Sequence, residues 1–220
     1  MNKWVNILKE ILCWLIIIVI ALLLSTLINS QLFALATVKE VSMQDTLFEG
    51  QTLIINRLAY KNKLPKKGDI IVFYQSREIG SFAREFLYSL KIINPFKKDE
   101  DESRDRLVKR VIGIPGDVID IIDGHVYLNG ELLEEPYVKG ITMQADFRLP
   151  VTVGDNQVFV MGDNREHSMD SRSFGLVDIS HIEGKAVFRI YPLNKFGRLM
   201  VTSPFKAPFN IIDFYCPAYL

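Results

Sequence analysis

Residues 118–133, VIDIIDGHVYLNGELL, carry the clearest structural signal in this 220-residue chain. Three runs of β-branched, aromatic and aliphatic residues are separated there by Asp123-Gly124 and by Asn129-Gly130. Both dipeptides suit two-residue turns that require positive φ, so each predicts a tight β-hairpin. Two hairpins in succession predict a meander of antiparallel strands.

Further strands are predicted on both sides of this meander. They are short runs rich in β-branched and aromatic residues, bounded by polar or turn-forming residues. The runs are TLIINRL (52–58), DIIVFY (69–74), QVFVMG (157–162) and KAVFRIYPL (185–193). The pattern breaks at residues 75–106, which end in the charged run KKDEDESRDR and are interpreted as an insertion. The sequence therefore predicts a mainly β class, with one antiparallel domain over residues 38–220.

Residues 11–28, ILCWLIIIVIALLLSTLI, contain no charged side chain. As a helix these 18 residues would span roughly 27 Å, close to the ~30 Å hydrocarbon core of a bilayer. Lys3 and Lys9 precede the run and only Glu10 opposes them, so residues 1–10 are expected in the cytoplasm. Residues 29–37 would form a juxtamembrane connector to an extracytoplasmic domain. The prediction is a single-pass protein of the cell membrane, with the lipid bilayer as a partner.

A cleaved secretory signal is the alternative interpretation of the N-terminal run. Ala34, Leu35 and Ala36 form a small-x-small motif a few residues beyond the run, as at a cleavage site. The apolar core of a secretory signal is usually ~7–15 residues long, however, and this run is longer. An uncleaved anchor is therefore favoured.

Composition excludes several classes of function. The 26 basic residues balance the 26 acidic residues, so no net charge favours a nucleic-acid partner. Cys13 and Cys216 lie near opposite ends of the chain, and the three histidines show no paired spacing. We therefore expect no disulfide framework, no metal site and no cofactor.

Two residues suggest nucleophilic chemistry. Ser42 lies in the polar stretch VSMQDTLFEG (41–50), soon after the apolar run. A serine hydroxyl needs a neighbouring base, and a lysine held neutral by burial can serve as one. Lys109, in RLVKRVIGIPGD (106–117), lies among apolar residues that would disfavour its charge. The local sequence alone favours the alternative of an edge-strand lysine that prevents aggregation.

The loop GDNREHSMDSRSFGLV, residues 162–177, follows a predicted strand. Its side chains readily bond to backbone groups, so the loop could be only a tightly hydrogen-bonded turn. It could equally orient catalytic groups, with Ser168 bonded to a lysine amine and Asp170 paired with Arg172. Composition does not separate the two interpretations.

Three of these segments together resemble type I signal peptidases, the membrane-anchored serine proteases that remove signal peptides from exported preproteins. SMQDTL (42–47) resembles the nucleophile motif of that family, and KRVIGIPGD (109–117) resembles its general-base motif. GDNREHSMDSRSFG (162–175) resembles its third motif, and GDIIVF (68–73) is similar to a structural one. The order of the motifs and the single N-terminal span also match.

The resemblance implies a role for each matching residue. Ser42 would be the nucleophile, Lys109 the general base and Ser168 the residue that orients the lysine amine. Asp170 and Arg172 would brace the loop, and the backbone N–H of Ser42 would contribute to the oxyanion hole. Signal peptides would bind as an added strand beside residues 37–41 and 106–108, and be cut after small-x-small motifs. Val41, Leu107 and Val108 are the expected substrate-binding residues.

Three positions depart from the family pattern. Asp45 stands at the usual proline, His167 replaces the usual asparagine, and Glu40 occupies a position where some members donate a hydroxyl. An ionised carboxylate cannot donate a hydrogen bond. The alternative function is therefore a membrane-tethered, peptide-binding β domain that has lost activity.

Overall fold

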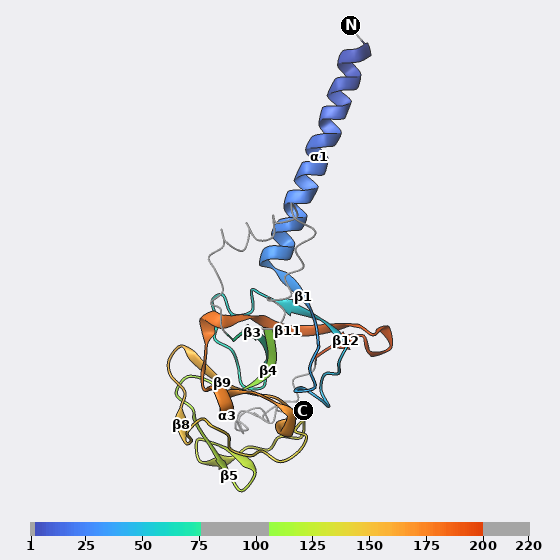
Figure 1. Ribbon diagram of the computed structural model, residues 1–220. Helices are drawn as coiled ribbons and strands as arrows, with labels where there is room; N and C mark the ends of the chain where they lie inside the picture. Colours follow the sequence, from blue (N-terminus) through green and yellow to red (C-terminus); the bar gives the residue numbers. More distant parts are fainter. Residues whose placement is uncertain (1–2, 76–105, 200–220) are drawn as a thin grey trace, which may run out of the picture.

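The computed structural model describes residues 3–75 and 106–199, which form a long N-terminal helix and a β domain (Figure 1). Every pair of neighbouring strands is antiparallel, so the predicted mainly β class is confirmed. The predicted insertion at 75–106 lies almost wholly outside the described residues, as does the C-terminal segment 200–220.

Among the described residues, the larger sheet has the strand order β1-β2-β11-β3-β4-β9-β10, with β12 paired to β11. Strand β4, which carries Lys109, therefore lies between β3 and β9 near the middle of the sheet. In chain order these strands are β1 (Phe33–Thr37), β2 (Thr52–Asn56), β3 (Ile70–Tyr74), β4 (Arg106–Gly113), β9 (Gln157–Met161), β10 (Val177–Asp178), β11 (Ile182–Tyr191) and β12 (Gly197–Arg198).

The predicted meander forms the smaller sheet, at the end of the domain remote from the long helix in Figure 1. Its strands are β5 (Val118–Ile122), β6 (His125–Leu128), β7 (Glu131–Leu132) and β8 (Val151–Thr152). Asp123 and Asn129 have φ of 50° and 55°, and the glycines that follow them have φ of 81° and 84°. Both predicted two-residue turns are confirmed, because the strand partners are Ile122 with His125 and Leu128 with Glu131.

The N-terminal helix α1 (Lys3–Gln31) extends away from the sheets in Figure 1. Most of its apolar side chains between Ile11 and Leu24 are at least half exposed. Among the described residues, no helix is both long and apolar enough to cross a membrane. The remaining helical turns are short: η2 (Arg165–His167), α3 (Ser171–Phe174), η3 (Ile179–His181) and η4 (Leu193–Lys195).

Residues 29–37, predicted as a juxtamembrane connector, join the long helix to the larger sheet. They form the last turn of α1 and strand β1, which pairs along its whole length with β2. The small-x-small motif lies inside this strand, with Ala34 opposite Ile55 and Ala36 opposite Leu53. The motif is therefore part of the sheet.

Three clusters of buried apolar side chains stabilise the domain. One of them contains Val38, Met43 and Leu47, which lie in and beside the loop that carries Ser42, and these pack against Leu53, Ile70 and Ala186 of the larger sheet. The loop is thus anchored by buried residues on both sides of the serine. Burial of each such side chain contributes about 1.5–3 kcal/mol, which is enough to hold the loop in one conformation.

Candidate active site

Ser42 and Lys109 are 67 residues apart in the chain and meet in the structure. The serine lies in the loop between β1 and β2, and the lysine lies in β4. Lys109 Nζ is 2.6 Å from Ser42 Oγ, within hydrogen-bond distance. Ser42 is 6% exposed and Lys109 is 1% exposed. The geometry is that of a nucleophile in contact with its base.

The environment of Lys109 favours the neutral amine. Burial lowers the pKa of Lys109 below its ordinary value, because the charged form loses its hydration. The carboxylates of Glu40, Asp170 and Asp163 oppose this effect, and the guanidinium of Arg172 adds to it. Because burial has the largest effect, the pKa of Lys109 is lowered overall. Its amine therefore loses its proton at a lower pH than the amine of an exposed lysine does.

The loop that carries Ser42 is held by backbone hydrogen bonds as well as by its anchors. The N–H groups of Thr46 and Leu47 both donate to the Met43 carbonyl, at 2.9 and 2.7 Å. Asn164 fixes the other side of the loop, because its backbone N–H donates to the Ser42 carbonyl at 3.0 Å and its Nδ2 to the Val41 carbonyl at 3.2 Å. A proline is therefore not required to close this turn.

Asp170 and Arg172 form a buried two-point ion pair. Arg172 Nε and Nη2 donate to the two carboxylate oxygens of Asp170 at 2.8 and 2.9 Å. Arg172 also donates to the carbonyls of Arg165 (2.7 Å) and Met143 (3.2 Å), and Asp170 accepts from the Gly162 N–H (3.0 Å). Burial alone would raise the pKa of Asp170, but Arg172 and the Gly162 N–H hold it below its ordinary value. The carboxylate is thus charged and holds the loop to the end of β9.

Ser168 lies in the same loop without the expected bond to Lys109. Its Oγ is buried and makes no hydrogen bond within the described part of the chain, although the hydroxyl is close enough to Asp170 to help lower the pKa of that carboxyl. Gly162 lies between Ser168 and the nucleophile. A Cβ added to Gly162 would lie against Ser168 Oγ and 2.5 Å from the Ser42 carbonyl oxygen. The absence of a side chain at Gly162 therefore allows the two serine-bearing loops to approach each other.

A second buried ion pair lies beside the dyad and was not anticipated from the sequence. Arg110 donates to Asp163 from Nε at 2.8 Å and from Nη2 at 2.6 Å, and its guanidinium carbon lies 3.9 Å from the centre of the Tyr137 ring. Thr46 Oγ1 also donates to Asp163, at 2.5 Å. Both residues lie inside the family motifs, but nothing in those motifs indicates that they pair with each other.

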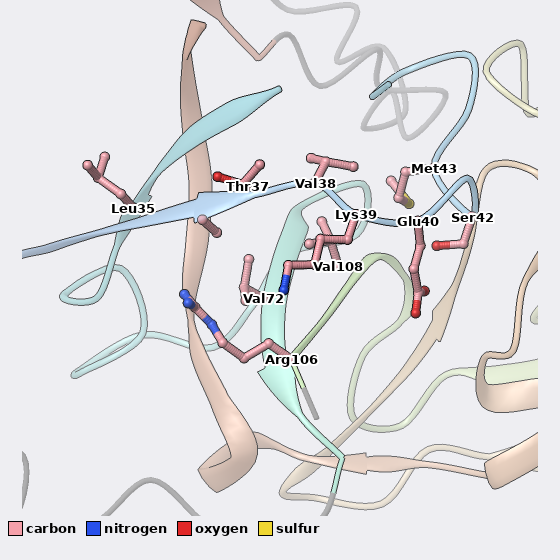
Figure 2. A pocket seen from close by; sticks show the side chains of 11 residues that line it. Leu35, Thr37, Val38, Lys39, Glu40, Ser42, Met43, Val72, Arg106 and Val108 are labelled. Atoms are coloured by element: carbon pink, nitrogen blue, oxygen red, sulfur yellow. The ribbon is translucent and has the colours of Figure 1, made fainter. Parts of the chain in front are cut away.

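A cavity of about 600 Å³ opens beside Ser42. Figure 2 shows the side chains of Val72 and Val108 between the two ends of this cavity, with Ser42 at one end and Arg106 toward the other. Val72 and Val108 are strand partners in β3 and β4, so they face the cavity together. Of the expected substrate-binding residues, Val108 lines the cavity. Val41 and Leu107 do not, and Leu107 is buried in the core with Ile71 and Phe73 because its side chain alternates to the other face of β4.

The three departures from the family pattern have different surroundings. Asp45 is exposed and lies 3.5 Å from Lys139, so its charge has a partner away from the dyad. His167 is exposed, and its backbone N–H closes a turn onto the Asn164 carbonyl at 3.2 Å. Glu40 lines the cavity next to Ser42.

Residues 11–191 match the family described as "Signal peptidase, peptidase S26". The chain belongs to the signal peptidase family. It is 33% identical over 192 residues to signal peptidase I of Bacillus licheniformis, covering 83% of this chain and 89% of that protein. It is 30% identical over 204 residues to signal peptidase IB of Staphylococcus aureus, covering 86% of this chain and 93% of that protein. A crystal structure of a signal peptidase I from Enterococcus faecalis aligns with 56% of this chain and 97% of its own, at 29% identity and a TM-score of 0.37.

Proposed function

We propose that this signal peptidase is a membrane-anchored serine endopeptidase that cuts exported preproteins after small-x-small motifs by means of Ser42 and Lys109. The 2.6 Å contact between a buried lysine amine and a serine hydroxyl at the end of a cavity is the main support. Lys109 is buried and its amine contacts a serine hydroxyl, and no described carboxylate forms an ion pair with it. Such burial of a lysine is unfavourable for stability, which argues for a chemical role.

The reaction follows from this contact. Ser42 Oγ attacks the carbonyl carbon of the scissile bond while its proton passes to the neutral Lys109 amine. The tetrahedral intermediate then collapses, its C–N bond breaks, and the Lys109 ammonium returns the proton to the leaving amine. Water hydrolyses the acyl-enzyme with the same amine as base and regenerates Ser42. The Ser42 N–H is the proposed backbone donor to the oxyanion.

The cavity is the proposed binding site for the end of the signal peptide. It is bordered on one side by the chain from Leu35 to Glu40 and on the other by Arg106 and Val108 of β4. An extended peptide could lie between these segments as an added strand. Val38, Met43 and Val108, which pack in one apolar cluster, would form the floor against which a small side chain fits. Of the three expected substrate-binding residues, Val108 is thus the one that we propose to contact the peptide.

The other residues of the third motif have positioning roles in this proposal. Asp170 and Arg172 hold the loop against the end of β9 through the bonds described above. Ser168 Oγ, which is buried and makes no hydrogen bond among the described residues, is available to orient the Lys109 amine after a small rearrangement on substrate binding. These are positioning roles, because the hydrogen bond to Ser42 Oγ comes from Lys109 and not from these three side chains.

The proposed anchor is residues 11–28, within α1. This helix has 29 residues, so it is about 43 Å long, more than the ~30 Å required to span a bilayer core. Its apolar side chains are exposed, and it extends away from the β domain, which supports insertion in lipid. The N-terminus would be cytoplasmic and the β domain extracytoplasmic.

Cleavage of a preprotein by the full chain in detergent tests this function. N-terminal sequencing of the product should show a cut directly after a small-x-small motif, and Ser42→Ala should give no product. Binding of the signal peptide without turnover by the unmodified chain would instead favour the inactive, peptide-binding alternative.

A further inference from the structure

Three carboxylates raise the pKa of Lys109 against the effect of burial, and they differ in their partners. Asp163 is paired at two points with Arg110, and Asp170 is paired at two points with Arg172. In both pairs the guanidinium offsets the negative charge of the carboxylate. The remaining carboxylate is that of Glu40, which has the largest effect of the three on the pKa of Lys109.

Glu40 has no such partner. No ion pair or hydrogen bond of its side chain is found within residues 3–75 and 106–199, and the residue is exposed. Figure 2 shows its side chain beside that of Ser42, and both residues line the cavity. The other charged residues that line the cavity are Lys39 and Arg106, and Arg106 forms an ion pair with Glu183 at 2.6 Å.

We propose that Glu40 is the counter-charge of the dyad, a residue that acts through Lys109 by stabilising the ammonium formed when Ser42 loses its proton. This inference rests on the proposed roles of Ser42 and Lys109. It differs from the role of a hydroxyl at this position, because a carboxylate cannot donate to an oxyanion.

Substrate binding makes this charge more effective. A peptide in the cavity displaces water around Glu40, and the attraction between opposite charges grows as the local dielectric constant falls. An unpaired carboxylate covered in this way is unfavourable while Lys109 is neutral. The attraction becomes favourable only when the amine takes the proton, so Glu40 stabilises the transition state more than the bound substrate.

The pH dependence of kcat/KM and kcat distinguishes this role from a structural one. Lys109 must be neutral to act as the base, and Glu40 favours its charged form. Glu40→Gln should therefore move the acid limb of both profiles to lower pH, by roughly half to one unit for a charge that acts through partly hydrated surroundings. It should also lower the alkaline plateau of kcat several-fold, because the ammonium loses its counter-charge. Glu40→Asp should restore the position of the limb.

Glu49→Gln is the matched control, because it removes the same charge from an exposed residue of the same loop that does not line the cavity. Its acid limb should coincide with that of the wild type. An acid limb of Glu40→Gln that stays in place or moves to higher pH would overturn the proposal. Ser42→Ala and Lys109→Met are measured in the same assay. If both abolish cleavage, an unmoved acid limb in Glu40→Gln refutes only the role of Glu40. If either variant retains cleavage, the proposed roles of Ser42 and Lys109 are themselves refuted.

Discussion

Arg110 and Asp163 form an ion pair with side chains that are 0% and 1% exposed, and this pair joins the strand of Lys109, the proposed base, to the loop that follows β9. Lys109 precedes Arg110 in β4, and Asn164, which holds the nucleophile loop, follows Asp163. The pair therefore fixes the separation of the two segments on which the dyad depends.

Removal of one member of this pair should destabilise the fold strongly. Asp163→Ala leaves the Arg110 guanidinium buried and without its carboxylate, which typically lowers the free energy of unfolding by about 3–5 kcal/mol. Urea denaturation of the detergent-solubilised chain measures this loss. Lys139→Ala is the control, because its ion pair with Asp45 is exposed and should contribute under about 1 kcal/mol. Similar midpoints for the two variants would contradict the structural role given to Asp163.

Gly162→Ala tests the close approach of the loops that carry Ser42 and Ser168. The added Cβ would lie 2.5 Å from the Ser42 carbonyl oxygen, so the nucleophile loop must move. A displacement of about 1 Å can reduce the rate roughly 100-fold. We expect such a loss in kcat/KM for a preprotein substrate.

Gly197→Ala is the matched control for Gly162→Ala, since nothing lies within 4 Å of a Cβ at that position. It should have the activity of the wild type. Full activity in Gly162→Ala would show that the loop accommodates a side chain without moving Ser42.

Ser168→Ala should affect activity without affecting stability. The hydroxyl of Ser168 lies close to Asp170, but that carboxylate keeps its hydrogen bonds from Arg172 and from the Gly162 N–H when the hydroxyl is removed. If the hydroxyl orients the Lys109 amine during the reaction, kcat should fall by about 10–1000-fold. Thermal unfolding and turnover measured on the same preparation separate the two effects. A change in Tm with no change in kcat would assign Ser168 a purely structural role.

Activity should rise with pH and remain high under alkaline conditions. Burial lowers the pKa of Lys109, and only the neutral amine can accept the Ser42 proton. The rate therefore increases as the pH passes upward through that lowered pKa, and no basic group has to stay protonated above it. A profile governed by a group near the histidine reference of ~6.5, and lost in His167→Ala, would speak against a lysine base.

The sequence predicted the features that depend on local residues. Asp123-Gly124 and Asn129-Gly130 specify two-residue turns by their own backbone preferences, and both turns are present. Strand β1 was missed because its residues continue the apolar composition of α1, and only pairing with β2 makes them a strand. Leu107 was assigned to the groove because the family motif does not indicate which side chains of β4 face the cavity.

Contacts between distant residues could not be read from the sequence. The motifs contain Arg110 and Asp163, but their ion pair joins residues 53 positions apart and depends on the pairing of β4 with β9. The same holds for Asn164, whose bonds to the Ser42 loop require the loop after β9 to lie beside it. The role given to Glu40 likewise depends on the fold, because only the folded chain pairs Asp163 with Arg110 and places Glu40 beside Ser42 in the cavity.

Transfer of an acyl group to Ser42 is the most direct test of the dyad. The full chain is incubated with an activated ester of a peptide ending in Ala-x-Ala, quenched with acid and examined by mass spectrometry of its proteolytic fragments. The acyl group should be found on Ser42 in the wild type and should be absent from folded Lys109→Met at the same pH. An acyl group on another residue, or equal acylation of Ser42 in Lys109→Met, would contradict the proposal that Ser42 is the nucleophile and Lys109 its base.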